Sequence, residues 1–347
     1  MAYSGLLRVN VAPLVDVCEV LARAARYGHE AQSRAACQRA IAPLAQALRV
    51  GAGAADAADG FAQAYARAAE LALRGADELA ACENSPEPVL MVMRAARYSA
   101  YVMELLYPFV GEVRALDRWF SVDGVLPRPR GDNVDVGVGH LANERGSKGG
   151  CSLYVPESYA LDGPAMALVI ALHGGAGHGR TFLWSWLRHA RSREFIVLAP
   201  TSVGDTWSLM EPQADVANIS RMVEWMTARW RIDTNQVLLT GMSDGGTFSL
   251  LGGLQADFPC THVAPFAASF HPLMLEMVDW ARVRHTPLHF THGRYDWMFP
   301  VGMAQEAAQT FRAAGANVTL TEIDDLAHTY PQEHNAALID WFLTKRS

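Results

Sequence analysis

The feature that most restricts the fold of this chain is a serine placed between a predicted strand and a predicted helix. The aliphatic residues 237–239 lead directly into Gly-Met-Ser-Asp-Gly at residues 241–245, and helix-compatible residues follow from Thr247. The glycines on both sides of the serine suit a sharp strand-to-helix turn, because a Cβ atom at either position would collide with passing backbone. This layout is typical of a nucleophile elbow, so Ser243 is the leading candidate for a catalytic nucleophile.

Gly-x-Ser-x-Gly is a short pattern, and the partners of the serine must support it. A serine hydroxyl needs a base near neutral pH, and the base needs an acid that orients it. In the fold that uses this elbow, the acid and the histidine follow the serine in that order. A predicted buried strand at residues 288–293 ends in a loop with Asp296, and a second strand at 318–323 is followed by His328. The chain therefore offers Asp296 as the acid and His328 as the base.

Both partners have alternatives in the sequence. Asp324 and Asp325 lie closer to His328 along the chain and compete with Asp296 for the role of the acid, although either could instead cap the following helix. His328 could be an ordinary loop histidine. Its position directly after the last predicted strand favours the catalytic interpretation.

Several segments together resemble the α/β-hydrolases, and more narrowly the branch of esterases, feruloyl esterases and polyhydroxybutyrate depolymerases. They are Leu172–Gly175, Ile232–Val237, Gly241–Gly246, His292–Asp296 and Leu326–His328. The resemblance covers about residues 135–347. It implies a serine esterase with Ser243 as nucleophile, Asp296 as orienting acid and His328 as general base, and this chemistry requires neither a metal nor an organic cofactor.

The resemblance also implies where the reaction's negative charge is stabilised. A continuous apolar run at residues 165–172 predicts a strand buried on both faces, and a glycine-rich loop follows it. Acyl transfer places charge on the former carbonyl oxygen, which preorganised N–H groups stabilise. The implied donors are the amides of Gly175 and Asp244, with Ala176 as the alternative to Gly175. We expect the Asp244 side chain to act only as a helix first-turn acid.

Two other interpretations of the glycine-rich loop are weaker. A phosphate-binding loop would need Gly-Lys-Ser/Thr, which the chain lacks here. His173 and His178 could suggest a metal, but no nearby carboxylate or thiolate completes a ligand set. We therefore expect structural histidines.

The chain divides by composition into two predicted domains. Residues 1–124 are alanine-rich with apolar residues at helical spacing, which predicts four helices in an all-α domain. Residues 125–347 alternate apolar strands with helices, which predicts a mostly parallel sheet flanked by helices, and the resemblance implies that this is the α/β-hydrolase sheet. Alternating valines within residues 134–154 predict an antiparallel hairpin at its start. Pro43 and Pro108 are expected to kink or end helices.

Composition excludes several other classes of function. The net charge of −7 and the lack of a long basic stretch argue against nucleic acid as a partner. The five cysteines are scattered without a C-x-x-C pair, so neither a disulfide framework nor a zinc site is expected. The sequence shows no secretory signal and no apolar run long enough for a membrane span, so we expect a cytoplasmic protein.

The substrate is the least constrained part of the prediction. Candidate lining residues of an apolar acyl pocket, or else plain packing residues, are Trp207, His271, Trp297 and Met298. Only a short segment separates Phe270 from Pro287, which leaves little room for a helical cap there. The N-terminal helices are therefore expected to act as a lid or as the contact of a homodimer.

The sequence thus predicts a hydrolase of carboxylic esters that acts through an acyl-enzyme on short or medium acyl esters or on hydroxyacid oligoesters. A peptidase or thioesterase with the same three residues remains an alternative. A non-catalytic binding protein of the same fold is the third interpretation.

Overall fold

The computed structural model describes residues 11–27, 31–52, 60–122, 125 and 135–344. These residues form two compact units, one within residues 1–126 and the other within residues 127–347. The domain boundary predicted from the sequence lies close to this division.

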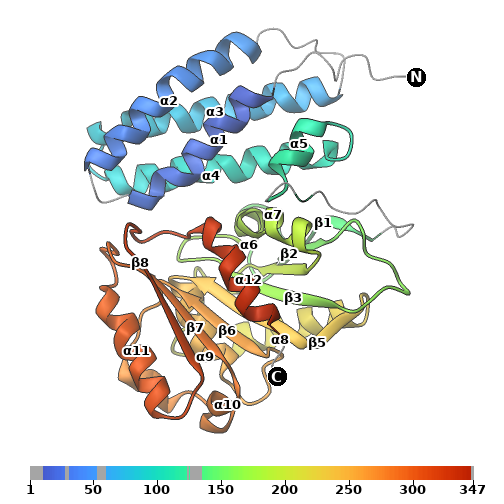
Figure 1. Cartoon of the computed structure of the whole chain (residues 1–347), viewed down its shortest axis with the longest axis vertical. Helices are drawn as coiled ribbons and strands as arrows, with labels where there is room; N and C mark the ends of the chain where they lie inside the picture. Colours follow the sequence, from blue (N-terminus) through green and yellow to red (C-terminus); the bar gives the residue numbers. More distant parts are fainter. Residues whose placement is uncertain (1–10, 28–30, 53–59, 123–124, 126–134, 345–347) are drawn as a thin grey trace. The chain divides into compact units, whose positions relative to one another are not determined.

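The first unit is a set of helices, drawn in blue and cyan in Figure 1. The helices are α1 (Ala12–Ala24), α2 (Ala31–Ala52), α3 (Gly60–Ala81), α4 (Pro88–Leu106) and the short α5 (Arg114–Trp119). The four long helices agree with the sequence pattern. A Cβ atom on Gly75 of α3 would lie 2.9 Å from Leu21 of α1 and 3.0 Å from Tyr98 of α4, so the absent side chain lets the three helices approach closely.

The prolines of this unit behave differently from one another. Pro43 lies inside α2, which continues past it, so of the two expected effects the end of the helix does not occur there. Pro88 is the first residue of α4, where a missing N–H is tolerated. Pro108 lies in a short 3-10 turn that directly follows α4.

The second unit contains one eight-stranded sheet in the order β1-β2-β4-β3-β5-β6-β7-β8. Its strands are β1 (Gly137–Leu141), β2 (Cys151–Val155), β3 (Met166–Leu172), β4 (Ile196–Pro200), β5 (Ile232–Met242), β6 (His262–Phe266), β7 (Leu288–Gly293) and β8 (Val318–Ile323). The predicted hairpin is confirmed, because β1 pairs with β2 in antiparallel register. β2 pairs antiparallel with β4, and the remaining pairs are parallel.

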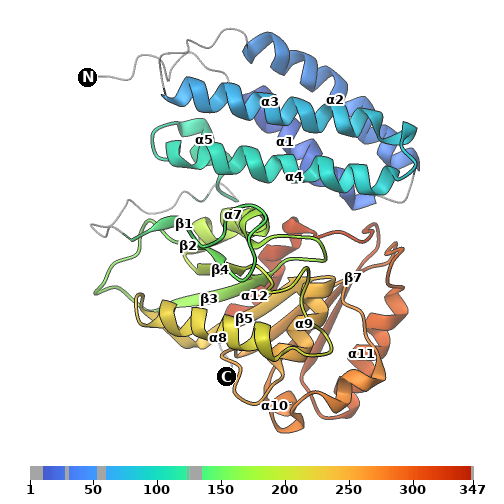
Figure 2. The same ribbon diagram turned by 180° about the vertical axis from the view of Figure 1, so that it is seen from behind.

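Helices cover both faces of this sheet. They are α6 (Gly179–Phe182), α7 (Trp184–Arg193), α8 (Gln213–Thr227), α9 (Asp244–Gly253), α10 (Trp280–His285), α11 (Val301–Ala313) and α12 (Asn335–Leu343). Figures 1 and 2 show α7 and α12 on one face and α8, α9 and α11 on the other. Right-handed crossovers explain this division, since the chain moves one way along the sheet from β3 to β4 and the other way from β4 onward.

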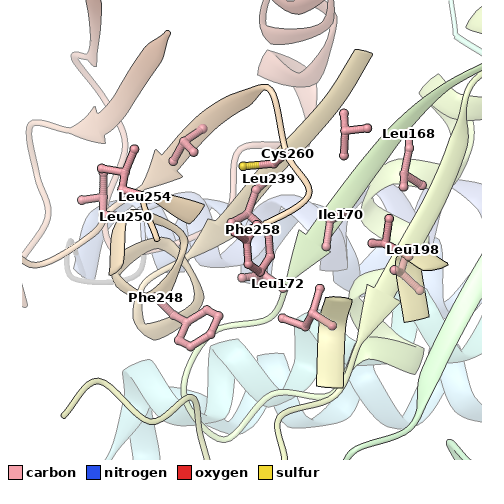
Figure 3. Packing of buried hydrophobic residues seen from close by; sticks show 14 of the residues in the cluster. Leu168, Ile170, Leu172, Leu198, Leu239, Phe248, Leu250, Leu254, Phe258 and Cys260 are labelled. Atoms are coloured by element: carbon pink, nitrogen blue, oxygen red, sulfur yellow. The ribbon is translucent and has the colours of Figure 1, made fainter. Parts of the chain in front are cut away.

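The hydrophobic core lies between the sheet and the helices α8, α9 and α11. Alternate residues of β3, Leu168, Ile170 and Leu172, enter a cluster with Phe248 and Leu250 of α9, and Figure 3 shows this packing. A buried sheet of this kind fixes the ends of its strands, which are the points where the candidate site residues lie.

The segment between β6 and β7 carries no helical cap. It contains only a 3-10 turn at Pro272–Glu276 and the six-residue helix α10. In the part of the chain that the structure describes, no helix has the length and apolar character needed to cross a membrane.

Candidate active site

Ser243 lies on a strained turn between β5 and α9. Its backbone has φ 56° and ψ −117°, a conformation that L-residues adopt only when the surroundings impose it. Its N–H donates to the carbonyl of Phe266 in β6 (2.9 Å), and its carbonyl accepts from the backbone N–H (2.8 Å) and the hydroxyl (3.0 Å) of Thr247. Neighbouring elements therefore hold both sides of the serine's backbone in place.

Glycines permit this turn by letting backbones touch. A Cβ atom on Gly241 would lie 2.5 Å from the backbone of Gly245. One on Gly245 would lie 2.4 Å from the carbonyl oxygen of His173. Both contacts involve backbone, which cannot move aside like a flexible side chain.

We expect Gly245→Ala to destabilise the protein by about 3 kcal/mol, because the added methyl group must displace the β3 loop or α9. Denaturant unfolding of the purified variant measures this loss. Gly302→Ala in α11 is the matched control, because a Cβ atom there meets nothing within 4 Å. The control should leave stability unchanged or raise it by about 1 kcal/mol through better helix propensity. Equal stabilities of the two variants would contradict the close packing described here.

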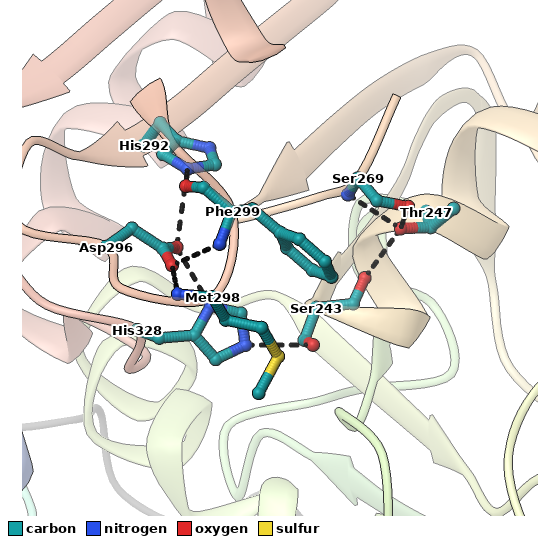
Figure 4. Close-up of polar contacts among 8 residues, drawn as sticks. All are labelled: Ser243, Thr247, Ser269, His292, Asp296, Met298, Phe299 and His328. Carbon is teal, nitrogen blue, oxygen red and sulfur yellow. Dashed lines mark hydrogen bonds and ion pairs between the residues drawn. The ribbon is translucent and has the colours of Figure 1, made fainter. Parts of the chain in front are cut away.

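The three residues predicted as a triad meet at the carboxyl edge of the sheet (Figure 4). His328 Nε2 lies 3.0 Å from Ser243 Oγ, and His328 Nδ1 lies 2.8 Å from Asp296 Oδ2. Ser243, Asp296 and His328 are all buried, with 7%, 7% and 4% of their surface exposed. A proton on Nδ1 that is donated to the carboxylate leaves the Nε2 lone pair facing the serine hydroxyl.

Asp296 is surrounded by hydrogen-bond donors. Its Oδ1 accepts from the N–H groups of Met298 (2.9 Å) and Phe299 (2.8 Å), and its Oδ2 lies near His328 and 3.3 Å from His292 Nε2. Burial alone would raise the pKa of this carboxyl group, but the hydrogen bonds from His292, His328 and Phe299 outweigh burial and hold its pKa well below the usual range. The carboxylate is therefore charged whenever the protein is folded near neutral pH.

The competing acids lie elsewhere. Asp324 is exposed and forms an ion pair with Arg294 (3.2 Å), and the same arginine binds Glu322 (3.0 Å). Asp325 follows Asp324 in the loop and is exposed as well. The structure places Asp296, and neither alternative, against His328.

The glycine loop after β3 passes beside the nucleophile. A Cβ atom on Gly174 would lie 3.5 Å from the Ser243 Cβ, and one on Gly175 would lie 2.8 Å from Asp244 Oδ2. Among the described residues, the Gly175 and Asp244 amides donate no hydrogen bond, so both remain able to bind a developing oxyanion. Their role, and the choice between Gly175 and Ala176, stays a prediction.

Two histidines hold this loop in place through hydrogen bonds. His173 Nε2 accepts from the Ser202 N–H (3.2 Å), which leaves the proton on Nδ1 for the Gly174 carbonyl (2.7 Å). Burial lowers the pKa of His173 to about 4, so its ring is neutral. His178 accepts from the Arg180 N–H and thereby caps α6. Within the described residues no group of histidine, cysteine and carboxylate side chains could hold a metal ion.

The predicted pocket residues divide into two groups. Trp207 is buried, in line with the packing alternative, because its ring packs against His173 and its Nε1 donates to the His173 carbonyl (2.7 Å). Trp297 and Met298 are 39% and 45% exposed in the loop that carries Asp296, and the Trp297 ring lies 6.0 Å from that of His328. His271 is exposed and caps the turn after β6.

Sequence reasoning gave three side chains of the site no role beside the triad residues or Asp244. Phe299 places its ring 5.3 Å from that of His328, and His292 approaches Asp296 as described above. Thr206 donates its hydroxyl proton to Asp244 Oδ2 (2.7 Å), so the Asp244 side chain ties the loop after β4 to the elbow helix. This differs from its expected role as a first-turn acid alone. His292 had a signal, since it belongs to the segment that carries Asp296.

Comparison with known proteins agrees with this geometry. Residues 210–345 match the family described as phospholipase/carboxylesterase. No curated protein is similar enough to the chain to count as a match.

Several solved structures resemble the chain at low sequence identity. A bifunctional GH43-CE protein of Bacteroides eggerthii has a TM-score of 0.50 and 14% identity, over 61% of this chain and 36% of that one. The fluorophosphonate-binding serine hydrolase F of Staphylococcus aureus has a TM-score of 0.48 and 13% identity, over 60% of this chain and 98% of that one. An acetyl xylan esterase from Aspergillus awamori has a TM-score of 0.47 and 15% identity, over 59% and 98%.

The sheet order and the strained serine turn define the class of fold: the second unit has the α/β-hydrolase fold. Within this fold, the segment from the approach to α8 through α12 is similar to phospholipases and carboxylesterases.

Proposed function

We propose that the chain hydrolyses carboxylic esters through an acyl-enzyme, with short or medium acyl esters or hydroxyacid oligoesters as substrates. The observation that carries this proposal is the pair of contacts at His328, 3.0 Å to Ser243 Oγ and 2.8 Å to Asp296 Oδ2. A neutral imidazole between a hydroxyl and a buried carboxylate is the arrangement that makes a serine nucleophilic.

In the proposed reaction the Ser243 oxygen attacks the ester carbonyl, and His328 Nε2 takes the hydroxyl proton. The oxyanion binds the amides of Gly175 and Asp244, and the imidazolium gives its proton to the leaving alcohol. Water then attacks the acyl-enzyme while His328 accepts its proton, and the carboxylic acid leaves as the imidazolium returns this proton to Ser243 Oγ. Asp296 stays ionised in both steps and stabilises the charged imidazole.

Direct labelling and a substrate panel test this proposal on the full chain. A fluorophosphonate should label one serine, and p-nitrophenyl esters of increasing acyl length should be hydrolysed faster than matched acyl-CoA thioesters and aminoacyl amides. Preference for the thioester or the amide would replace the esterase by a thioesterase or peptidase. Absence of both labelling and turnover would favour a binding protein of the same fold.

A further inference from the structure

A second histidine touches the acid of the triad. His292 is the fifth residue of β7, is 1% exposed, and has its Nε2 2.8 Å from the carbonyl oxygen of Phe299 and 3.3 Å from Asp296 Oδ2. Both of these partners are acceptors, so the His292 Nε2 must carry a proton. One N–H group therefore faces a loop carbonyl and the catalytic carboxylate at once.

These contacts close a ring of interactions around the carboxylate, which Figure 4 shows. The Phe299 N–H donates to Asp296 Oδ1 (2.8 Å), and the carbonyl of the same residue accepts from His292. His292 thus holds the loop whose Phe299 ring lies 5.3 Å from the His328 ring. The loop and the carboxylate cannot move independently while this ring is intact.

We propose that His292 is a positioning residue that acts through Asp296: it aims Oδ2 at His328 Nδ1 and takes up part of the carboxylate's negative charge. This inference rests on the proposed esterase function. Its N–H competes with His328 for the same oxygen, so it limits how strongly the carboxylate holds the imidazolium. Loss of the His292 donor should therefore misalign the pair and change the pH dependence of the reaction.

Other charged groups near these residues are accounted for. Glu322 pairs with His292 across the β7–β8 ladder, and its carboxylate is bound by Arg294 (3.0 Å) and Gln305 (2.8 Å). Asp324 binds the same arginine. Around His328, the described contacts are those to Asp296, Ser243 and the two aromatic rings. The charge balance at His328 is thus set chiefly by Asp296 and, through it, by His292.

The test compares variants that remove the donor with one that keeps it. His292→Leu and His292→Met remove it, whereas His292→Gln can place an amide N–H near the position of Nε2. For an ester substrate we expect the apolar variants to lose about 30-fold in kcat with little change in KM, as for a lost hydrogen bond to a charged group. The acid limb of their kcat/KM profile should move upward by about half a pH unit. His292→Gln should recover most of both quantities.

The matched control is His289→Leu, which makes the same substitution on the same strand. His289 Nε2 contacts Thr321 Oγ1 (2.9 Å), away from the triad, so kcat and the pH limb should stay at wild-type values. Thermal unfolding establishes that each variant is folded. If either folded apolar variant keeps the wild-type kcat and pH limb, or if His292→Gln is as impaired as the apolar variants, the proposal is overturned.

Failure of the esterase assignment would look different. In that case the wild-type protein itself would prefer the thioester or the amide to the ester, or would show neither fluorophosphonate labelling nor turnover. Failure of the His292 proposal alone leaves an active, labelled wild type beside unaffected variants.

Discussion

Replacing Ser243 with alanine is expected to lower kcat for an ester by about five to six orders of magnitude, because no other hydroxyl can form the acyl-enzyme. The rate that remains would come from the oxyanion donors and substrate binding. Initial rates of hydrolysis of a p-nitrophenyl ester measure the loss of kcat. Fluorophosphonate labelling should disappear in the same variant.

The control for this substitution is Ser249→Ala in the same helix. Ser249 is buried and donates to the Gly246 carbonyl (2.6 Å), so the loss of its hydroxyl perturbs α9 without touching the triad. We expect the control to keep its labelling and its rate to within a few-fold. Substantial esterase activity in folded Ser243→Ala would exclude this serine as the nucleophile.

Asp296→Asn is expected to lower kcat by about 10⁴-fold at neutral pH. The asparagine NH2 group would replace the oxygen that now accepts from His328 Nδ1. His328 would then accept a hydrogen bond from this NH2 group through an unprotonated Nδ1. The proton of the imidazole would then lie on Nε2, where the ring cannot accept the serine proton. Initial rates across a pH series measure the effect.

Asp324→Asn and Asp325→Asn are the matched controls for the acid, since both residues are exposed and were alternatives in the sequence. Each should retain wild-type kcat, because neither is bound to His328 in the structure. A loss in one of them as large as in Asp296→Asn would assign the acid to that residue.

The sequence predicted the sheet well because its signals are local. The apolar run of β3, the aliphatic residues before the serine and the alternating valines near the start of β1 each indicate a strand without reference to distant contacts. The order of serine, acid and histidine followed from the strand ends that carry them. The choice of Asp296 over Asp324 and Asp325 needed the register of β7 and β8, which places the end of β7 beside the loop that carries His328.

Side-chain roles that depend on packing could not be predicted in this way. Trp207 follows a strand end like a rim residue, yet its ring fills space beneath the glycine loop. The second donor on Asp296 depends on a turn that brings His292 and Phe299 together. Pro43 remains within α2, an outcome that helix propensity alone does not favour.

The reactive centre consists of two subassemblies. The nucleophile is held by β5, β6 and α9, whereas the acid and base are held by the loops after β7 and β8. Each subassembly is internally bonded, and among the three triad side chains one contact, from His328 to Ser243, joins them. The nucleophilicity of Ser243 therefore depends on how well these two subassemblies are aligned. A small shift of one against the other would break the contact between His328 and Ser243 and inactivate the serine, while the hydrogen bonds within each subassembly stay intact.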